Sequence, residues 1–435
     1  MDIVYPCCAG LDVHKKTVVA CVRRLAANGK VHKEVRTFGT MTSNLLSLAD
    51  WLAQEGVTHA AMESTGVYWK PVWNILDEQF QLLLVNARHI KQVPGRKTDV
   101  KDSEWIAELL QHGLLRGSFV PPAPQRELRE LTRQRMQLMH QKASVANRIQ
   151  KILEDANVKL ASVATDVLGV SARDMLQAII AGQENPAVLA DLARRKLRAK
   201  IPELQSALQG RVTEHHRFML KLLLDQVTQL EELIERLSQR ITATLPASMK
   251  EALPRLVQVP GVAARATENI LAEIGTNMGQ FPTAGHLCSW VGMCPGNNAS
   301  AGKHKSGRTT KGNQWLRSTL VQVAWAASHT KDTYVATQYR RLAGRRGKKR
   351  ALVAVAHTIL IILYHLLKKP DATYRDLGPA YLDQLQSKQL TNHLVRRLER
   401  LGYKVSLERA AEAEGTAWEP VDGATLVDAA AACSP

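Results

Sequence analysis

Residues 1–115 alternate between short apolar segments and amphipathic stretches. Segments rich in β-forming residues occur at Val4–Leu11, Thr17–Val22, Val31–Phe38, His59–Met62 and Gln81–Val85. Helical periodicity marks Ser43–Glu55, Lys70–Glu78 and Ser103–His112. Because only short turns, Asn28-Gly29 among them, separate the first three strands, we expect an antiparallel meander. The order of elements predicts an α/β domain of the RNase H-like type, parts of which other α/β folds share.

Two long helices are expected after a cluster of prolines that follows residue 120. The first covers residues 126–158, and Arg135 and Lys142 interrupt its apolar positions. The second repeats apolar residues every three to four positions between Leu220 and Ile241. This period predicts coiled-coil helices, paired either with each other or between protomers. Heptads usually report architecture rather than chemistry.

The pattern changes again beyond Leu253. Val257–Val262 and the helical segment that ends at Ile274 resemble a helix-hairpin-helix element, in which backbone amides and a glycine approach a phosphate. A Pro-Gly turn between helices is also common without that role. Residues 281–317 are expected to form a polar, glycine-rich loop, and residues 411–435 a disordered tail. Further helices are predicted at Trp315–Ser328, Ala351–Leu367 and Thr391–Leu401.

Composition narrows the class of partner. The chain has 435 residues, and its 58 Lys and Arg against 40 Asp and Glu give a formal charge of +18. This excess favours a nucleic acid as partner, with a basic but unrelated enzyme as the alternative. The six cysteines show no paired CxxC spacing, which argues against structural zinc and suits a reducing cytoplasm. Ala351–Leu367 is too short for a membrane span and contains two histidines, so a soluble intracellular protein without a membrane partner is expected.

Four acidic residues lie where the expected fold would gather them. Asp12 ends the first predicted strand, Glu63 ends the fourth, and Asp99 and Asp102 open the last helix of the domain. In an RNase H-like sheet the first and fourth strands are adjacent and parallel, so their carboxyl ends bring Asp12 and Glu63 together. Two aspartates three residues apart share one helical face and can close the site.

Four converging carboxylates would repel one another unless cations neutralised them. Oxygen ligands select Mg²⁺ or Mn²⁺, and two such ions about 4 Å apart activate the attacking oxygen and stabilise the leaving oxygen of a phosphodiester.

Each acid also has a structural interpretation. Asp99 fits a helix N-cap with Asp102 three residues later, Asp12 fits a turn, and Glu63 could pair with Lys70.

A second group of candidate residues lies in the glycine-rich loop. Ser300, within Ser-Ala-Gly-Lys, carries a hydroxyl that could attack a phosphate, or it could contact a phosphate or form a turn. Positive charge comes from Lys303, Lys305, Arg308 and Lys311. Downstream, seven basic residues fall within eleven positions, which favours backbone contact with nucleic acid over a solvated loop. They are Arg340, Arg341, Arg345, Arg346, Lys348, Lys349 and Arg350.

The ordered motifs resemble those of the insertion-sequence-110 family of DEDD transposases, to which pilin-gene DNA invertases are related. The N-terminal motifs are Gly10-Leu11-Asp12-Val13-His14-Lys15, Met62-Glu63-Ser64-Thr65-Gly66-Val67-Tyr68-Trp69 and Lys97-Thr98-Asp99-Val100-Lys101-Asp102. The C-terminal motifs are Val259-Pro260-Gly261-Val262, Ser300-Ala301-Gly302-Lys303, Gly307-Arg308, Lys311-Gly312-Asn313, Leu316-Arg317, Tyr374-Arg375-Asp376-Leu377-Gly378 and Leu394-Val395-Arg396-Arg397-Leu398. The resemblance covers about residues 5–406 and is highly specific as an ordered set.

The resemblance implies a RuvC-like DEDD nuclease domain over residues 1–120, a coiled-coil and dimerisation region over 121–250, and a mostly helical transposase domain over 251–370. A helical extension over 371–410 and the tail would follow. The resemblance also implies Mg²⁺, or Mn²⁺, held by the four acids, and a covalent phosphoserine link to DNA at Ser300, with Ser306 as the fallback nucleophile. Ala301 stands where many relatives have glycine.

The same resemblance implies several partners. They are donor and target DNA, a structured guide (bridge) RNA from the element's own ends, and a homodimer that assembles into a tetramer. The expected function is therefore strand cleavage and exchange during insertion and excision of a mobile element in a bacterial cytoplasm. The alternatives are a RuvC-like junction endonuclease that uses water, a site-specific DNA invertase without an RNA guide, and a nucleic-acid-binding scaffold with an inactive nuclease fold.

Overall fold

The computed structural model describes residues 2–64, 66–86, 90, 102–296, 298–300, 303–385 and 387–407. For residues 298–300, 303–306 and 388–390 it describes the backbone alone. The chain divides into two compact units, Met1–Pro121 and Pro122–Pro435.

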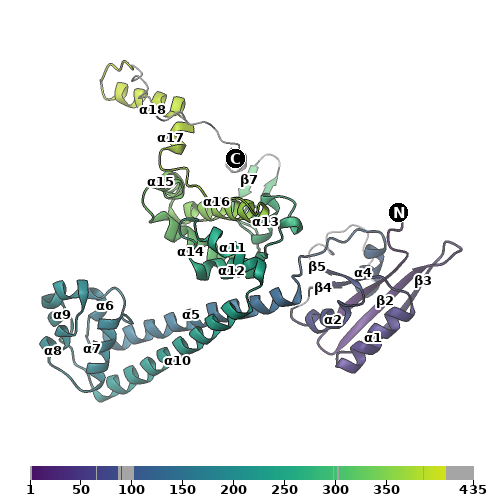
Figure 1. Cartoon of the computed structure of the whole chain (residues 1–435), viewed down its shortest axis with the longest axis horizontal. Helices are drawn as coiled ribbons and strands as arrows, with labels where there is room; N and C mark the ends of the chain where they lie inside the picture. Colours follow the sequence, from purple (N-terminus) through teal and green to yellow (C-terminus); the bar gives the residue numbers. More distant parts are fainter. Residues whose placement is uncertain are drawn as a thin grey trace. The chain divides into compact units, whose positions relative to one another are not determined.

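The first unit is built on a mixed sheet of five strands in the order β3-β2-β1-β4-β5 (Figure 1). The strands are β1 (Cys7–Val13), β2 (Thr17–Leu25), β3 (Val31–Gly39), β4 (His59–Glu63) and β5 (Gln81–Val85). The first three pair antiparallel, which confirms the expected meander, whereas β4 pairs parallel with both β1 and β5. The Asn28-Gly29 turn that was predicted between β2 and β3 is present. Gly29 adopts a φ of 76°, and the side chain of Asn28 accepts a hydrogen bond from the amide of Lys30.

Helices cover both faces of this sheet. On one face, α1 (Thr42–Gln54) and α2 (Trp69–Leu76) contribute to a core that contains every second residue of β1, such as Ala9 and Leu11. On the other face, α4 (Asp102–Gln111) packs over Cys8 and Ala61. This alternation follows from the two-residue period of a strand whose two faces are both buried.

The backbone of α4 lies very close to β1. A Cβ atom added to Gly10 would stand 2.3 Å from the amide nitrogen of Ala107 and 2.3 Å from the carbonyl oxygen of Ser103, so no side chain fits there. Ion pairs from the meander hold the outer side of the helix: Lys33 contacts Glu104 at 2.7 Å and Arg23 contacts Glu108 at 3.9 Å.

The second unit begins with two long helices, α5 (Ala123–Asp155) and α10 (Glu214–Thr244) (Figure 1). The two helices pack against each other within one chain and run antiparallel, as the contacts between them show: residues further along α5 meet residues earlier along α10. Lys142 pairs with Glu231, Arg148 hydrogen-bonds Gln226, and Asp155 pairs with His216. Coiled-coil packing in the strict sense stays a prediction.

Two charged residues that interrupt the apolar pattern of α5 have partners in the structure. Lys142 lies 2.6 Å from Glu231 of α10. Arg135 is 1% exposed, and its guanidinium donates to Glu268 at 2.7 Å and to Asn269 at 3.0 Å. Both of these acceptors belong to α12 (Ala264–Ile274), so Arg135 marks the place where the C-terminal helices pack on α5.

A small helical bundle closes the far end of the α5–α10 pair, in a segment for which the sequence pattern predicts no elements. It comprises α6 (Leu160–Val163), α7 (Val170–Ile180), α8 (Pro186–Asp191), the 3₁₀ helix η1 (Arg195–Lys200) and α9 (Ile201–Ala207). These helices share one apolar core with α5 and α10. They are too short and too often interrupted for a long helical period to be visible in the sequence.

The C-terminal helices gather around a buried central helix. They are α11 (Ala247–Leu256), α12, α13 (Ala284–Val291), α14 (Gln314–Ser328), α15 (Tyr334–Arg346) and α16 (Lys348–Lys368). The short 3₁₀ helix η2 (Met278–Gln280) precedes α13, and α17 (Tyr381–Leu385) and α18 (Ser387–Arg400) follow α16. Helix α16 has the length and hydropathy of a membrane span, yet its residues are mostly buried against α11, α13, α14 and α15. Its burial identifies it as a core helix of this unit, whereas the expectation that the segment is too short for a span is wrong, because the helix has 21 residues.

Another expectation for this region is wrong. Residues 281–317 are not one loop, because α13 occupies Ala284–Val291, where Thr283 caps the helix by accepting from the amide of His286. The short apolar stretch and the flanking glycines concealed the helical period. The basic residues 340–350 lie in helices, with α15 and α16 meeting at Gly347, so the solvated loop that was the alternative for this run is absent there.

Replacing Gly10 by alanine should lower the free energy of unfolding of the first unit by about 1–3 kcal/mol, because the new methyl group would overlap the backbone of α4. Gly117→Ala is the matched control, since a Cβ there would meet only Leu83, at an ordinary 3.8 Å. Urea unfolding followed by tryptophan fluorescence would measure both. Equal stability of the two variants would contradict the close packing of α4 on β1.

Candidate functional site

Asp12 and Glu63 lie on neighbouring parallel strands at the same end of the sheet. Leu11 of β1 pairs with Met62 of β4, and Asp12 and Glu63 are the next residue of each strand. Because Leu11 and Met62 both belong to the core beneath α1 and α2, the acids that follow them face the opposite side, which α4 covers. Strand β1 continues to Val13, so Asp12 lies within the strand rather than at its end or in a turn.

Helix α4 brings Asp102 to that same end. The helix runs antiparallel to β1: the thiol of Cys8 donates to the carbonyl of Ala107, and the amide of Val4 donates to the carbonyl of Gln111. Since Ser103 lies against Gly10, the first residue of the helix, Asp102, lies toward the end of β1 that carries Asp12. Three of the four predicted acids thus share one end of the sheet.

The geometry of these acids is open rather than closed. The side chain of Asp12 is 25% exposed, and one of its oxygens lies 3.1 Å from Nε2 of His14. Asp99 lies outside the described residues. Among the residues that are described, no three histidine, cysteine or acidic side chains are close enough to hold a metal ion together. A metal site here stays a prediction.

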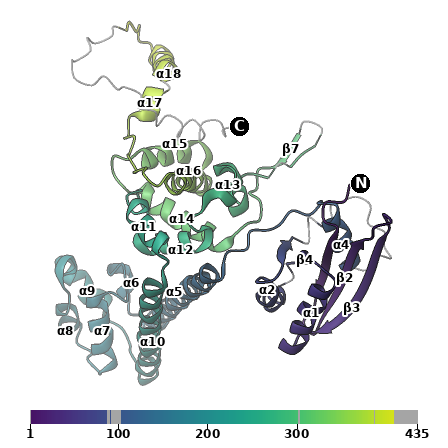
Figure 2. The same cartoon turned by 45° about the vertical axis from the view of Figure 1, so that its right-hand side comes forward.

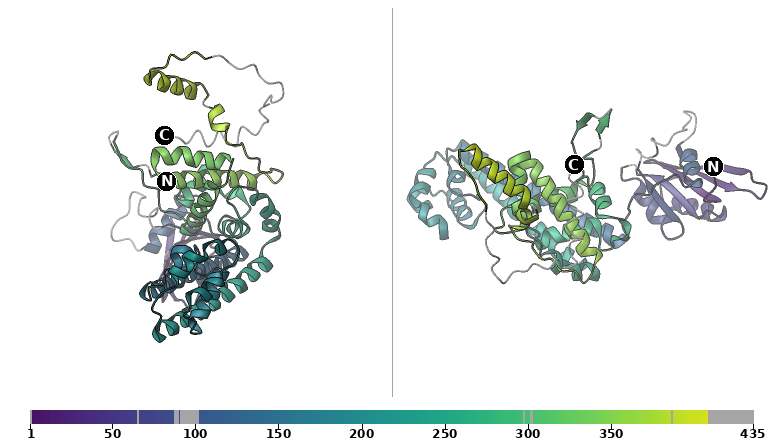
Figure 3. Two further views of the ribbon diagram at one scale, coloured as in Figure 1. Left: turned by 90° about the vertical axis from the view of Figure 1, so that its left-hand side faces the viewer. Right: turned by 90° about the horizontal axis from the view of Figure 1, so that it is seen from above.

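The loop that contains Ser300 forms a two-stranded hairpin, β6 (Asn298–Ser300) and β7 (Lys303–Ser306), which projects from the helices of the second unit (Figure 2, Figure 3). Ser300, the last residue of β6, pairs with Lys303, the first residue of β7, whereas Ser306 pairs with Asn298 at the base. The two candidate nucleophiles therefore occupy opposite ends of the hairpin. The side chains of Ser300, Lys303, Lys305 and Ser306 lie outside what is described.

Two glycines fix the base of the hairpin. A Cβ on Gly312 would stand 2.3 Å from the backbone of Val291, and a Cβ on Gly292, whose φ is 79°, would stand 2.7 Å from the carbonyl oxygen of Thr310. The segments leading to and from the hairpin also pair, since the amide of Gly296 donates to the carbonyl of Arg308. The chain around Gly312 is thus held against the end of α13.

Asn313 connects this segment to a buried network. Its side-chain oxygen accepts from the amide of Leu316 and caps α14, while its side-chain nitrogen donates to Glu273 at 2.6 Å. Glu273 is 2% exposed and receives two hydrogen bonds from Arg133, at 2.7 and 2.8 Å. Nε of Arg129 lies 3.4 Å from a carboxylate oxygen of Glu273. Burial lowers the pKa of the Arg129 guanidinium to about 10, although the negative charge of Glu273 acts to raise it.

The glycine of the Val259-Pro260-Gly261-Val262 turn has a packing role. The turn joins α11 to α12, as the resemblance to a helix-hairpin-helix element predicts. Gly261 has a φ of 80°, and a Cβ there would stand 2.5 Å from the carbonyl oxygen of Val323 and 2.6 Å from the amide nitrogen of Ala327. The close approach that this glycine permits is therefore to α14.

Positive charge concentrates in the C-terminal helices. Residues 274–370 contain 15 of the 58 Lys and Arg but a single acidic residue, Asp332. Within this stretch Arg308 and Lys311 are exposed, and Arg341 pairs with Asp383 at 3.2 Å. The other residues of the predicted basic run are exposed around the junction of α15 and α16: Arg340, Arg345, Arg346, Lys348, Lys349 and Arg350. The scarcity of acidic residues around this run is a second indication of a nucleic-acid-binding surface, and a count of charges along the sequence would have revealed it.

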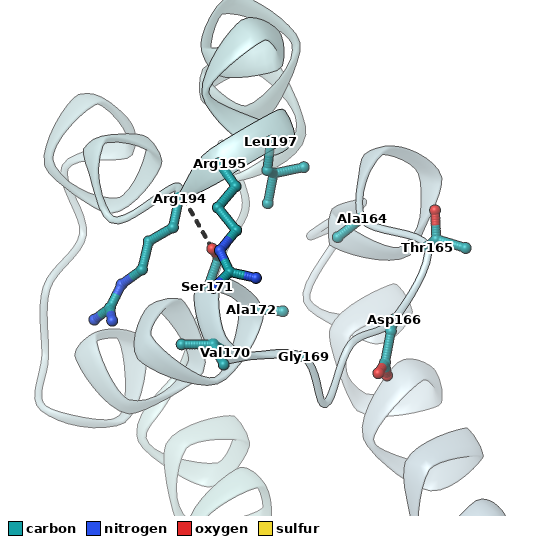
Figure 4. A pocket seen from close by; sticks show the side chains of 10 residues that line it. All are labelled: Ala164, Thr165, Asp166, Gly169, Val170, Ser171, Ala172, Arg194, Arg195 and Leu197. Carbon is teal, nitrogen blue, oxygen red and sulfur yellow. Dashed lines mark hydrogen bonds between the residues drawn. The ribbon is translucent and has the colours of Figure 1, made fainter.

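A pocket of about 470 Å³ opens in the small bundle beyond α5 and α10, far from these motifs in the chain (Figure 4). Arg194, Arg195 and the first turn of α7 line one side, and Ala164, Thr165 and Asp166 lie across from them. The amide of Arg194 donates to the hydroxyl of Ser171, and its guanidinium is paired with Asp174 at 2.6 Å. The charge on this wall is therefore partly neutralised within the bundle.

Comparisons with known proteins match both halves of the chain. A family model described as "Transposase", of the DEDD type of IS110, matches residues 9–158, and a model described as "Transposase IS116/IS110/IS902 family" matches residues 253–340. A curated relative, the "Insertion element IS110 uncharacterized 43.6 kDa protein" of Streptomyces coelicolor, is 26% identical over 304 residues, covering 65% of this chain and 73% of its own. The chain belongs to the IS110 family of transposases.

Membership of the IS110 family makes this chain a DNA transposase, an enzyme that cuts and rejoins DNA. The two matched segments contain the acids of the first unit and the hairpin of the second. An α/β N-terminal domain with a mostly helical remainder is confirmed.

Glu273→Ala should destabilise the second unit by about 3–5 kcal/mol, because Arg129 would be left buried without its carboxylate and the cap of α14 would lose a partner. Glu184→Ala is the control: Glu184 is 73% exposed in its pair with Arg217, so its loss should cost less than about 1 kcal/mol. Thermal unfolding of both variants measures the difference. A Glu273→Ala protein as stable as the control would refute the network.

Proposed function

We propose that this transposase cuts DNA through a divalent-cation site in its first unit, which we infer to be an RNase H-like nuclease domain. The observation that carries the proposal is the placement of Asp12, Glu63 and Asp102 at one end of the sheet, on the face that α4 covers. The strand order, with three antiparallel strands followed by two that run parallel to the first, supports the RNase H-like assignment.

The donor set fits Mg²⁺ or Mn²⁺, because carboxylate oxygens are the ligands that these hard cations prefer. Asp12, Glu63 and Asp102, together with Asp99 from the preceding motif, would hold the cations. A bound cation would polarise the scissile phosphodiester and stabilise the charge that develops on it.

The chain's own residues have defined tasks in this proposal. Gly10 lets α4 approach β1, which directs the first turn of the helix, with Asp102, toward the end of β1 that carries Asp12. His14 contacts a carboxylate oxygen of Asp12 and so orients that side chain. Lys33, through Glu104, holds the first turn of α4 in place. Each of these contacts fixes a carboxylate before any cation arrives, which lowers the cost of assembling the site.

We further propose that Ser300 is the nucleophile. Its Oγ would attack a DNA phosphorus, lose its proton to solvent and displace a sugar hydroxyl. The resulting phosphoserine ester would conserve the phosphodiester for rejoining when another sugar hydroxyl attacks. The position of Ser300 at the end of β6, within a hairpin that projects from the helices, supports this choice, since a large polymer can approach a projecting segment. Ser306, at the base, is the alternative.

Guidance by a structured RNA and assembly from dimers into tetramers complete the proposal. The stretch with 15 basic residues and one acid is long enough to serve more than one nucleic acid, which supports an RNA partner beside donor and target DNA. We place this activity in the bacterial cytoplasm, where the element's DNA lies. A junction endonuclease that uses water, or an invertase without RNA, would share the first unit and differ at the serine and the RNA.

Asp12→Asn and Glu63→Gln should each reduce Mg²⁺-dependent cleavage of the element's ends by about 100-fold or more, because even outer partners of metal ligands contribute about 10–100-fold. Asp50→Asn, an exposed acid on α1, is the matched control and should cleave normally. The measurement is the rate of strand cleavage on end-labelled DNA, with EDTA as a second control. Unchanged cleavage by both site variants would eliminate the nuclease assignment.

Ser300→Ala should abolish the covalent protein–DNA product, whereas Ser306→Ala should retain it. Denaturing electrophoresis of reactions with labelled DNA, followed by mass spectrometry of the attached peptide, identifies the serine. Loss of the adduct in Ser306→Ala alone would move the nucleophile to the base of the hairpin. Cleavage without any adduct in the wild-type protein would favour the endonuclease that uses water.

A further inference from the structure

Helix α14 carries an exposed indole ring that neither the fold nor the proposed chemistry uses. Trp325 is 59% exposed, and it is the one exposed tryptophan among the residues that the structure describes. The opposite side of the helix is buried through Leu316, Leu320 and Val323. Indole rings are enriched at interfaces because they combine a large apolar face with a polar N–H group, so Trp325 is a candidate contact for a partner outside the chain.

The indole ring is held in position by its neighbour. The ring of His329, one turn later, lies with its centroid 4.5 Å from that of Trp325, at an interplanar angle of 46°. Nδ1 of His329 lies 2.8 Å from the carbonyl oxygen of Trp325, which anchors the imidazole to the helix end. Because the indole ring is already held in place, it would lose little conformational entropy when a planar group binds to it.

Basic residues lie on the helix that carries Trp325 and in the segment that precedes this helix. Arg317 lies eight residues earlier on the same helix, within about a quarter turn by the 3.6-residue period and about 12 Å away along the axis. Arg308 and Lys311 are exposed in the segment between the hairpin and α14. From Gly275 to Lys331 the chain contains no acidic residue.

This charge pattern selects among the possible partners. A second copy of the same surface would bring like charges together, and one exposed ring is far below the area of a stable protein interface. A nucleic acid strand fits both features, because aromatic rings stack on unpaired bases while basic side chains contact the phosphates. The partner chemistry that this face matches is a single strand with an accessible base.

We propose that Trp325 is a stacking platform for an unpaired base of a nucleic acid strand whose backbone runs toward Arg317 and the hairpin. The inference rests on the proposed function, since strand cleavage and exchange expose unpaired bases near the nucleophile. It adds a binding residue on α14 to the carboxylates and the serine. It is independent of which serine attacks.

The test measures binding of fluorescently labelled oligonucleotides to the full-length protein by anisotropy, with no divalent cation present. The probes are single-stranded DNA, single-stranded RNA, an abasic DNA strand and duplex DNA. Trp325→Ala should weaken binding of the single strands that carry bases by about 5- to 150-fold, and Trp325→Phe should retain most of the affinity. The variants should bind abasic and duplex probes like the wild type. The probe that loses more affinity identifies DNA or RNA as the stacked strand.

Salt dependence separates stacking from charge. Trp325→Ala should leave the slope of log K against log salt unchanged, whereas Arg317→Gln should reduce its magnitude by about 0.7. Phe218→Ala is the matched control, because Phe218 is an aromatic residue on α10 that is 63% exposed, and it should have no effect.

Two results would overturn the inference. In the first, Trp325→Ala binds every probe like the wild type while Mg²⁺-dependent cleavage persists, which leaves the proposed function intact. In the second, Trp325→Ala changes sedimentation from oligomer to monomer without weakening single-strand binding, which makes the face a protein contact. A wild-type protein that bound none of the probes would instead contradict the proposed function itself.

Discussion

The candidate nuclease site depends on one steric condition, the absence of a side chain at Gly10. Because the strand presents only a hydrogen atom there, the backbone of α4 settles against β1 and its first residue reaches the end of the sheet that carries Asp12 and Glu63. Ion pairs from β2 and β3 also hold α4, but each includes one exposed partner and so contributes less than the backbone packing. Backbone contact, rather than charge, places the acids.

In the second unit, buried ion pairs hold the helices in position. Glu273 joins α5, through Arg133, to the cap of α14, and Arg135 joins α5 to α12. Such pairs add little net stability compared with apolar packing, but breaking one leaves an uncompensated charge, so they favour a single arrangement of the helices. The arrangement they favour carries the hairpin with the candidate nucleophile and the exposed face of α14.

Much of the first unit could be predicted from sequence, because its strands are short, rich in β-forming residues and separated by recognisable turns. The acids could be assigned to strand ends for the same reason, although β1 runs one residue past Asp12. The small bundle beyond α5 could not, since its helices are too short to show a period. Nor could the partners of Arg135, because its acceptors on α12 lie 130 positions or more along the chain. Trp325 falls within a predicted helix, but only the packing of α14 shows which face of that helix is buried.

The proposed cation site is tested most directly by titrating Mn²⁺ into the full-length protein and following the free ion by electron paramagnetic resonance. We predict tight binding by the wild-type chain that is lost in Asp12→Asn and weakened in Gly10→Ala, because the latter would move α4 and its acid away from β1. Binding that persisted unchanged in both variants would show that the cation is held elsewhere and that these carboxylates are not its ligands.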